Sequence, residues 1–146
     1  MNRERIDFLK KDFSQGFISY LGCKAEYIDA GIFHSSLEIR QDHKQQDGFV
    51  HAGVIATMAD HTAGYSAYTL VSENICILTI EFKINFFKPA IGDKLLCESE
   101  VIHSGKKLII SESNIYISSH NEQILISKAL VSLMAIPIEK IAKNKI

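Results

Sequence analysis

The sequence predicts an α+β domain in which one long helix is wrapped by an antiparallel sheet of five or six strands. Two short strand-like runs come first, one stretch with helical spacing occupies residues 49–70, and long alternating runs joined by short turns follow. Strands joined by tight turns pair antiparallel, whereas parallel strands need long crossovers. The order of the elements therefore favours one antiparallel sheet packed on one helix.

The composition is that of a single globular domain. The chain has 146 residues, of which 47% are hydrophobic and 23% are charged, and its net charge is -1. This length is sufficient for a hydrophobic core without disulfides or metals. We expect one domain over residues 1–146, with an N-terminal helix within residues 1–15 and a flexible basic tail at residues 138–146.

Charge and hydropathy argue against several classes of partner. A basic stripe typical of nucleic-acid binding is absent, and no apolar run approaches the roughly 20 residues of a membrane helix. The charged N-terminus does not have the pattern of a signal peptide. Cys23, Cys76 and Cys97 are scattered without metal-ligand spacing, so we expect reduced thiols, a cytoplasmic location and no metal site.

The first half of the chain contains the expected N-terminal helix and a hairpin. Residues 2–13 carry apolar side chains three and four apart, which predicts a helix. Residues 24–28 and 32–40 read as paired strands joined by the turn at Ala30-Gly31. A polar loop at residues 41–47 leads to the central helix.

The central stretch, residues 49–70, is unusually rich in small side chains. Small residues on more than one face allow other backbone to come close, so we expect this helix to be enclosed by a sheet and a partner chain. Its small residues are Ala52, Gly53, Ala56, Ala59, Ala63, Gly64, Ser66 and Ala67.

The second half of the chain alternates between apolar and polar residues. In its first run, Ile80, Phe82, Ile84 and Phe86 are expected on one face, with polar residues between them. Turns are expected at 92–93, 104–105 and 120–121. The four predicted strands are residues 75–87, 94–103, 108–118 and 123–136.

One formal charge, Asp60, stands within residues 49–72, with no Lys or Arg one helical turn away. Burying an unpaired carboxylate costs several kcal/mol unless donors surround it. Two readings of Asp60 follow: a structural carboxylate bonded to backbone or to a partner helix, and a catalytic group.

Residues 45–53, QQDGFVHAG, followed by Asp60 nine residues after His51, resemble a known signature. It is that of hotdog-fold acyl-CoA thioesterases of the phenylacetate-pathway type, within the 4-hydroxybenzoyl-CoA thioesterase superfamily. In that family a loop of the form N-x-x-G-x-x-H-G-G opens the central helix. The resemblance covers about residues 18–136, including the strand at 79–89. It implies a hotdog fold, a long helix wrapped by the antiparallel sheet.

The resemblance assigns catalytic roles to four positions. Asp60 would activate water or attack the thioester carbonyl, and Thr79 of a neighbouring subunit would position the water. The backbone N–H of Ala52 would polarise the carbonyl, and donors of this kind contribute about 2.7–4 kcal/mol to a transition state. Gln45 takes the place of the family's amide residue, and Ala52 that of its first glycine.

Further site residues follow from the same loop. His51 is a candidate general base, and the alternative is that it fixes the loop by hydrogen-bonding backbone at the helix start. Gln46 and Gly53 are candidate substrate contacts, and either Gln45 or Gln46 can face inward. His61 is expected to be structural or at an interface. The remaining histidines are expected at the surface: His34, His43, His103 and His120.

The predicted hairpin at 105–107 carries Lys106 and Lys107, which in this family can meet the phosphates of coenzyme A. The alternative is a solvated turn. The resemblance also implies that coenzyme A enters only as part of the substrate, with no other cofactor. It further implies a homodimer, or a homotetramer built from two dimers, with the sites at the dimer interface.

The leading functional prediction is hydrolysis of an acyl-CoA with a medium-chain or aromatic acyl group. Two alternatives use the same fold. One is an acyl-CoA-binding module without catalysis. The other is a hydratase or dehydratase, whose members carry a catalytic His in a proline-rich loop, while residues 41–50 contain no proline.

Overall fold

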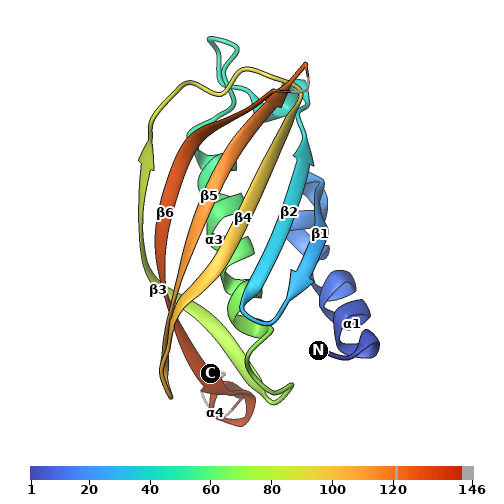
Figure 1. Cartoon of the computed structure of the whole chain (residues 1–146), viewed down its shortest axis with the longest axis vertical. Helices are drawn as coiled ribbons and strands as arrows, with labels where there is room; N and C mark the ends of the chain where they lie inside the picture. The colour runs from blue at the N-terminus through green and yellow to red at the C-terminus, as the bar shows by residue number, and fades with distance from the viewer. Residues whose placement is uncertain (121, 143–146) are drawn as a thin grey trace.

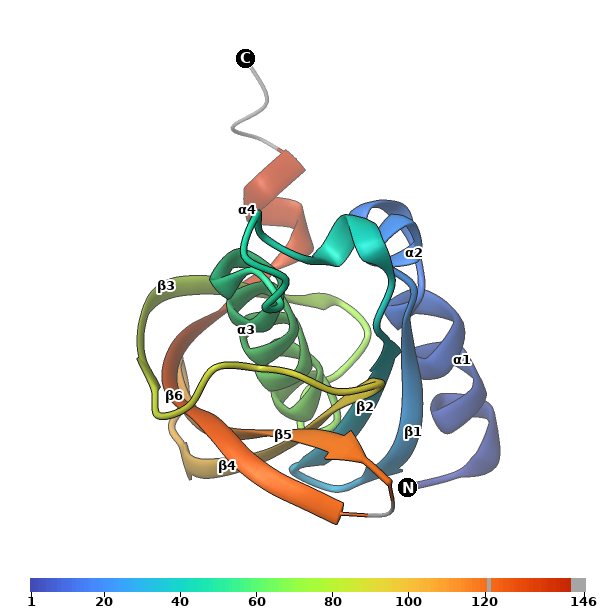
Figure 2. The ribbon, with the colours of Figure 1, turned by 90° about the horizontal axis from the view of Figure 1, so that it is seen from above.

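In the computed structural model, which describes residues 1–120 and 122–142, a six-stranded antiparallel sheet curls around helix α3, Ala52–Tyr68 (Figures 1 and 2). The strand order is β1-β2-β4-β5-β6-β3, so β1 and β3 are the edges. This confirms the predicted fold class. The strands are β1 Cys23–Asp29, β2 Ile32–Glu38, β3 Ile75–Phe86, β4 Lys94–Ser104, β5 Leu108–Ser119 and β6 Glu122–Pro137.

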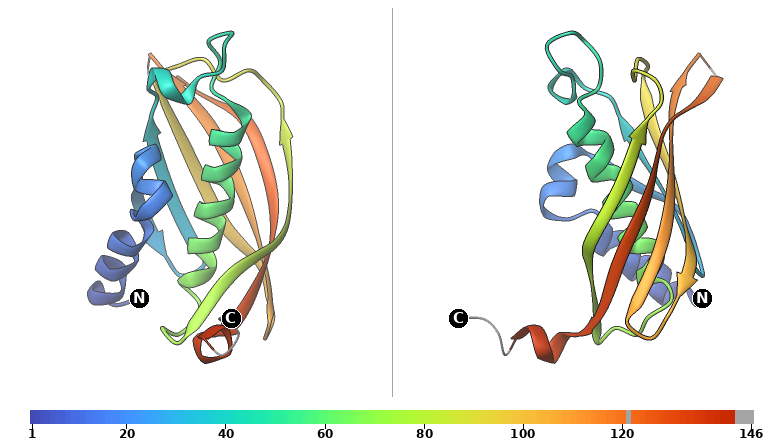
Figure 3. Two further views of the ribbon diagram at one scale, coloured as in Figure 1. Left: turned by 180° about the vertical axis from the view of Figure 1, so that it is seen from behind. Right: turned by 90° about the vertical axis from the view of Figure 1, so that its left-hand side faces the viewer.

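The N-terminal segment contains one helix more than expected. Helix α1, Arg3–Phe13, matches the prediction, and α2, Gly16–Leu21, follows it. Gly16 and Gly22 adopt positive φ angles at the two ends of this short helix. The two helices lie beside α3, on the side away from β3 (Figure 3).

Two predictions in the C-terminal part of the chain fall partly outside the described residues. The expected flexible tail begins instead with a short helix, α4, Ile138–Ala142, while Lys143 and Lys145 lie outside the described residues. Asn121 of the expected 120–121 turn also lies outside them. None of the described helices is both long and apolar enough to cross a membrane.

Buried hydroxyl groups join α3 to the concave face of the sheet. Ser113 Oγ of β5 donates to the carbonyl of Ala59 at 2.8 Å, and Ser35 and Thr62 share a hydrogen bond of 2.7 Å. Ser99 Oγ lies 2.6 Å from Ser113 Oγ. Because buried polar groups are costly unless paired, these contacts hold the helix at one position along the sheet. That position places Asp60, which follows Ala59 directly.

The edge strand β3 departs from simple alternation. Its pairing with β6 shifts between Thr79 and Glu81, so Ile80 is an extra residue in a bulge. The predicted uninterrupted apolar face of this strand is therefore wrong at that point. Phe82 and Phe86 are 39% and 46% exposed, although they belong to the longest apolar run of an edge strand. An exposed apolar edge of this kind is typical of a surface that another chain covers.

Candidate active site

Asp60 and Thr79 form the centre of the candidate site. Thr79 Oγ1 donates a hydrogen bond to Asp60 Oδ1 at 2.7 Å, joining the middle of α3 to the edge strand β3. Both side chains belong to the same chain, whereas the resemblance implied a hydroxyl from a neighbouring subunit, which stays a prediction. The second carboxylate oxygen of Asp60 has no hydrogen-bond partner among the described residues. It is therefore free to accept a proton or to attack.

Two cavities meet at Asp60. One, of about 500 Å³, is lined by Phe17, Ala56, Thr57 and Phe82 among others. The second, of about 240 Å³, continues along α3 toward its C-terminal end. A thioester bound at Asp60 can therefore extend in both directions along the helix.

His61, the neighbour of Asp60, has a structural contact. Its Nε2–H donates to the carbonyl of Phe13 at 3.0 Å, and its ring packs against Phe13 with centroids 4.6 Å apart. Burial lowers the pKa of His61 below its usual value, which keeps the ring neutral near pH 7. The expectation that His61 is structural agrees with this contact, which ties α1 to α3.

The loop that precedes α3 is held by backbone hydrogen bonds. The N–H of Gln45 donates to the carbonyl of Phe49 at 2.8 Å, and the turn between them needs the positive φ of 87° at Gly48. The N–H of Val50 donates to the carbonyl of Ala90 at 3.1 Å, which anchors the loop beside β4. This sets the direction in which the helix begins.

His51 is the N-cap of α3. Its Nδ1 accepts a hydrogen bond from the N–H of Gly53 at 2.8 Å. This contact agrees with the alternative that His51 fixes the loop at the helix start, rather than acting as a general base. A Cβ on residue 53 would lie 3.0 Å from this Nδ1, so Gly53 makes room for the cap. The Gly53 N–H is thus already paired with His51, and the substrate contact expected of Gly53 stays a prediction.

Gln45 and Ala52 face a common cavity of about 320 Å³. Gln46 does not line this cavity and is exposed, which favours Gln45 as the inward amide. Ala52 is the first residue of α3, where backbone N–H groups have no partner within the helix. The Ala52 amide and the Gln45 side chain, whose Nε2 also donates to Asp47 Oδ2 at 3.5 Å, are therefore the donor pair that borders this cavity at the positive end of the helix.

The donor pair and Asp60 are separated within one chain. Ala52 and Asp60 stand eight residues apart on α3, which at 1.5 Å per residue is about 12 Å along the axis. Groups that act on one carbonyl must both lie about 3 Å from the reacting atoms. One chain therefore carries two half-sites: the Gln45–Ala52 donors and the Asp60–Thr79 carboxylate.

Lys106 and Lys107 lie far from the Gln45–Ala52 donors. The hairpin that carries them follows the end of β4, whereas the Gln45 loop is bonded to Ala90, just before β4 begins. Eleven residues of strand span about 35 Å. Figure 1 shows the two loops at opposite ends of the sheet. The structure thus does not bring the lysines to these donors within one chain.

His43 was missed by sequence reasoning. It is buried, with 1% of its surface exposed, whereas the sequence suggested a surface residue. Its Nδ1 accepts from the N–H of Arg40 at 3.0 Å and its Nε2–H donates to the carbonyl of Leu21 at 2.9 Å. This ring ties the loop before Gln45 to the end of α2. The local sequence carries no signal for it, because Leu21 is 22 residues away.

The family model of the thioesterase superfamily matches residues 47–123, which is more than half of the chain. The matched range includes both Asp60 and Thr79. The chain belongs to the thioesterase superfamily. Within the described residues of this thioesterase, no group of three or more His, Cys, Asp or Glu side chains is placed to hold a metal ion.

Known proteins of similar sequence and structure agree with this family. "Putative esterase SSO1253" of Saccharolobus solfataricus is 28% identical over 77% of this chain and 72% of its own length. The crystal structure of a thioesterase family protein from Silicibacter pomeroyi has a TM-score of 0.88 and 29% identity, and it covers 91% of this chain and 98% of its own. A thioesterase from Haemophilus influenzae, at 16% identity over 90% of each chain, shares the fold with a TM-score of 0.81. The predicted hotdog fold and hydrolase class are confirmed.

Proposed function

We propose that this thioesterase hydrolyses acyl-CoA thioesters, with Asp60 as the reacting carboxylate. The observation that carries the proposal is the Asp60–Thr79 hydrogen bond of 2.7 Å at the junction of two cavities. Asp60 has no cationic partner among the described residues, so its free oxygen is available to a substrate or to water.

The reaction follows from this geometry. Thr79 holds one oxygen of Asp60 and leaves the other to take a proton from water as the water oxygen attacks the carbonyl carbon. Direct attack by the carboxylate, with water then releasing the acyl group, uses the same position. In both routes the C–S bond breaks, the thiolate of coenzyme A leaves with a proton, and the acid is released.

A second copy of the chain would complete the site. The Ala52 amide stands about 12 Å from Asp60 along the helix, too far to stabilise the oxyanion at the same carbonyl. Two copies related by a two-fold axis place each donor pair against the other copy's carboxylate if their α3 helices run antiparallel. The exposed apolar edge strand β3 supplies a surface for this pairing. We propose a homodimer, or a tetramer of two dimers, on this basis.

The walls of the cavities favour an apolar acyl group. Phe17 and Phe82 line one side of Asp60, and Tyr65, Tyr68 and Ile77 line the other. Medium-chain and aromatic acyl groups both match such walls. No cofactor enters the proposed chemistry, in which coenzyme A takes part only as the thiol half of the substrate.

The test measures thiol release from a panel of acyl-CoAs by the wild type and Asp60→Asn. Loss of a positioned base should lower kcat by at least about a hundredfold. Asp7→Asn, an exposed carboxylate on α1, is the matched control and should retain wild-type activity. Full activity of Asp60→Asn would refute the role of Asp60, and binding without turnover by the wild type would favour an acyl-CoA-binding module.

Mixing inactive variants tests the two half-sites. Ala52→Pro removes the amide hydrogen at the first helical position, where proline is well tolerated, and the extended His51 before it (ψ 135°) suits a following proline. We expect Ala52→Pro and Asp60→Asn to be inactive alone and active when mixed, because a mixed dimer contains one intact site. No recovery, with exchange of subunits confirmed, would refute the shared site.

A further inference from the structure

Three residues of α3 spaced four apart form one row on the open face of the helix: Asp60, Gly64 and Tyr68. Each is half-buried, whereas Thr62, Ala63, Tyr65, Ser66 and Ala67, which lie between them in the sequence, are buried. All three line the cavity of about 240 Å³ that begins at the Asp60–Thr79 pair. The row therefore marks a path from the reacting carboxylate toward the C-terminal end of the helix.

Gly64 leaves space on this path that the chain itself does not need. Glycine inside a helix is destabilising by about 1 kcal/mol relative to alanine. The backbone at Gly64 is ordinary helix, and a Cβ at this position would meet no atom within 4 Å. Neither the local conformation nor the packing of this chain thus requires glycine here. The free space lies one helical turn beyond Asp60, where it is available to a bound group.

Tyr68 closes the path. Its hydroxyl accepts from the N–H of Ile77 at 3.0 Å and donates to Sγ of Cys76 at 3.6 Å. These contacts hold the ring against β3, at the end of the cavity that begins at Asp60. A further cavity, of about 350 Å³, is also lined by Tyr68, the one described residue that lines both it and the cavity at Asp60 and Gly64. Tyr68 is therefore a shared wall between the cavity at the carboxylate and the one beyond it.

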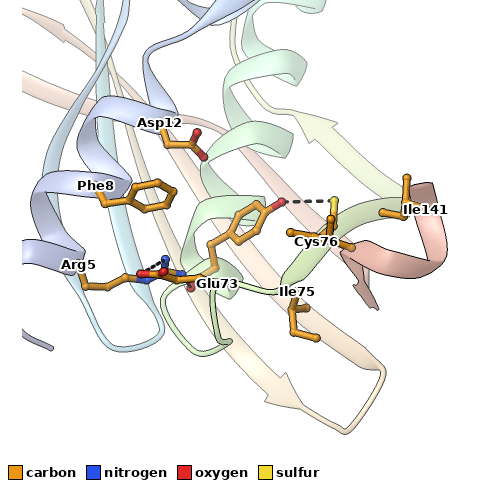
Figure 4. Close-up of a pocket in the computed structure, with 9 residues that line it drawn as sticks. Arg5, Phe8, Asp12, Glu73, Ile75, Cys76 and Ile141 are labelled. Atoms are coloured by element: carbon orange, nitrogen blue, oxygen red, sulfur yellow. Dashed lines mark hydrogen bonds and ion pairs between the residues drawn. The ribbon is translucent and has the colours of Figure 1, made fainter. Parts of the chain in front are cut away.

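The cavity beyond Tyr68 is mainly apolar. Figure 4 shows Phe8 of α1, Ile75 of β3 and Ile141 of α4 around it. Arg5 also reaches this cavity: its Nη2 donates to the carbonyls of Tyr68 and Val71, whereas its buried Nη1 has no hydrogen-bond partner among the described residues and lies 3.7 Å from Glu73. Because the carboxylates of Asp12 and Glu73 also line this cavity, it suits a hydrocarbon chain rather than a chain that ends in a carboxylate.

The two cavities that meet at Asp60 differ in their access to solvent. The larger one is bordered by Phe17 and Phe82, which are 62% and 39% exposed, so it lies at the surface. The arm of coenzyme A leads to a charged nucleotide that must stay in water, and this side can accommodate it. The side that passes Gly64 ends at Tyr68 and fits the apolar acyl chain.

We propose that the acyl chain lies along α3 from Asp60 over Gly64 to Tyr68, and that Tyr68 sets the longest acyl chain the enzyme accepts. This inference rests on the acyl-CoA hydrolysis proposed above. Tyr68 lies about 12 Å from Asp60 along the helix. In an extended polypeptide three consecutive backbone bonds span about 3.5 Å. At the same length per bond, an extended acyl chain of about 12 Å contains about ten bonds. The structure thus points to medium-length acyl chains and to a neutral chain end.

The experiment compares kcat/KM over saturated acyl-CoAs of increasing length. Tyr68→Ala joins the two cavities, so the ratio of long-chain to medium-chain kcat/KM should rise at least about tenfold, as expected when two or more further methylenes are buried. Gly64→Leu fills the path and should move the preference to shorter chains. Tyr68→Phe keeps the ring and should leave the preferred length unchanged.

A matched control and a fold check complete the design. Tyr116→Ala removes a tyrosine from the sheet face turned away from α3 and should keep the wild-type length profile. Thermal unfolding is recorded for every variant. If Tyr68→Ala does not fold, the chain-length profile of Gly64→Leu tests whether the acyl chain lies over Gly64.

Distinct outcomes would overturn the inference. A uniform loss at all chain lengths in Tyr68→Ala would remove Tyr68 as the length-setting residue while leaving acyl-CoA hydrolysis intact. An unchanged length profile in Gly64→Leu, with an altered oligomeric state in size-exclusion chromatography, would assign the space over Gly64 to a second copy of the chain. Absence of turnover by the wild type on every acyl-CoA would overturn the proposed function and this inference together.

Discussion

The hydrogen bond from Thr79 to Asp60 predicts a catalytic loss with little loss of stability. Thr79→Val keeps the β-branched shape on an exposed edge position and removes only the hydroxyl that donates to Oδ1 at 2.7 Å. Hydrogen bonds to charged groups contribute about 1.5–3 kcal/mol, and solvent at this exposed position favours the lower end. A loss of about 1.5 kcal/mol corresponds to about tenfold in rate.

The assay is steady-state thiol release, with kcat and KM determined separately. We expect kcat of Thr79→Val to fall about tenfold with little change in KM, since the hydroxyl orients the reacting carboxylate and not the substrate. Thr79→Ser, which keeps the donor, should retain most of the activity. A kcat for Thr79→Val within twofold of the wild type, with unfolding unchanged, would refute the positioning role.

Three further predictions concern the frame around the site. Ser113→Ala removes the buried hydroxyl that joins the carbonyl of Ala59 to Ser99 Oγ and should lower the free energy of unfolding by about 1–3 kcal/mol, measured by urea denaturation. Gly53→Ala forces a Cβ against the His51 ring and should cost about 0.5–2 kcal/mol through the lost N-cap, measured in the same way, and an unchanged midpoint would contradict this role of Gly53. Burial lowers the pKa of His43, and its bonds to Arg40 and Leu21 require the neutral ring, so the unfolded chain binds more protons. The free energy of unfolding should therefore fall as the pH drops below about 6.5, and urea titrations at several pH values should show a flatter dependence for His43→Asn.

Most of the fold was predictable because its signals are local. Each strand was expected within two residues of its observed ends, since period-two alternation and short turn pairs depend only on neighbouring residues. Helix α2 escaped notice because Gly16 and Gly22 indicate breaks, and six residues are too few to show a helical period. The bulge after Thr79 was also missed, because the sequence on both sides of it alternates without interruption.

For the candidate site, the sequence alone determined the groups but not their arrangement. It singled out Asp60 as a lone charge in an apolar helix from spacing along one element, whereas Ala52 was placed at the start of that helix by the resemblance to the thioesterase loop.

The tertiary structure decided which groups meet. Pairing of β3 with β6 at the sheet edge brings Thr79 to Asp60 within one chain, while the helix rise keeps Ala52 about 12 Å away. Only the folded chain shows that Tyr68 stands between two cavities. The physical reason is that periodicity reports which face of an element is buried, whereas the order of the strands determines what covers that face.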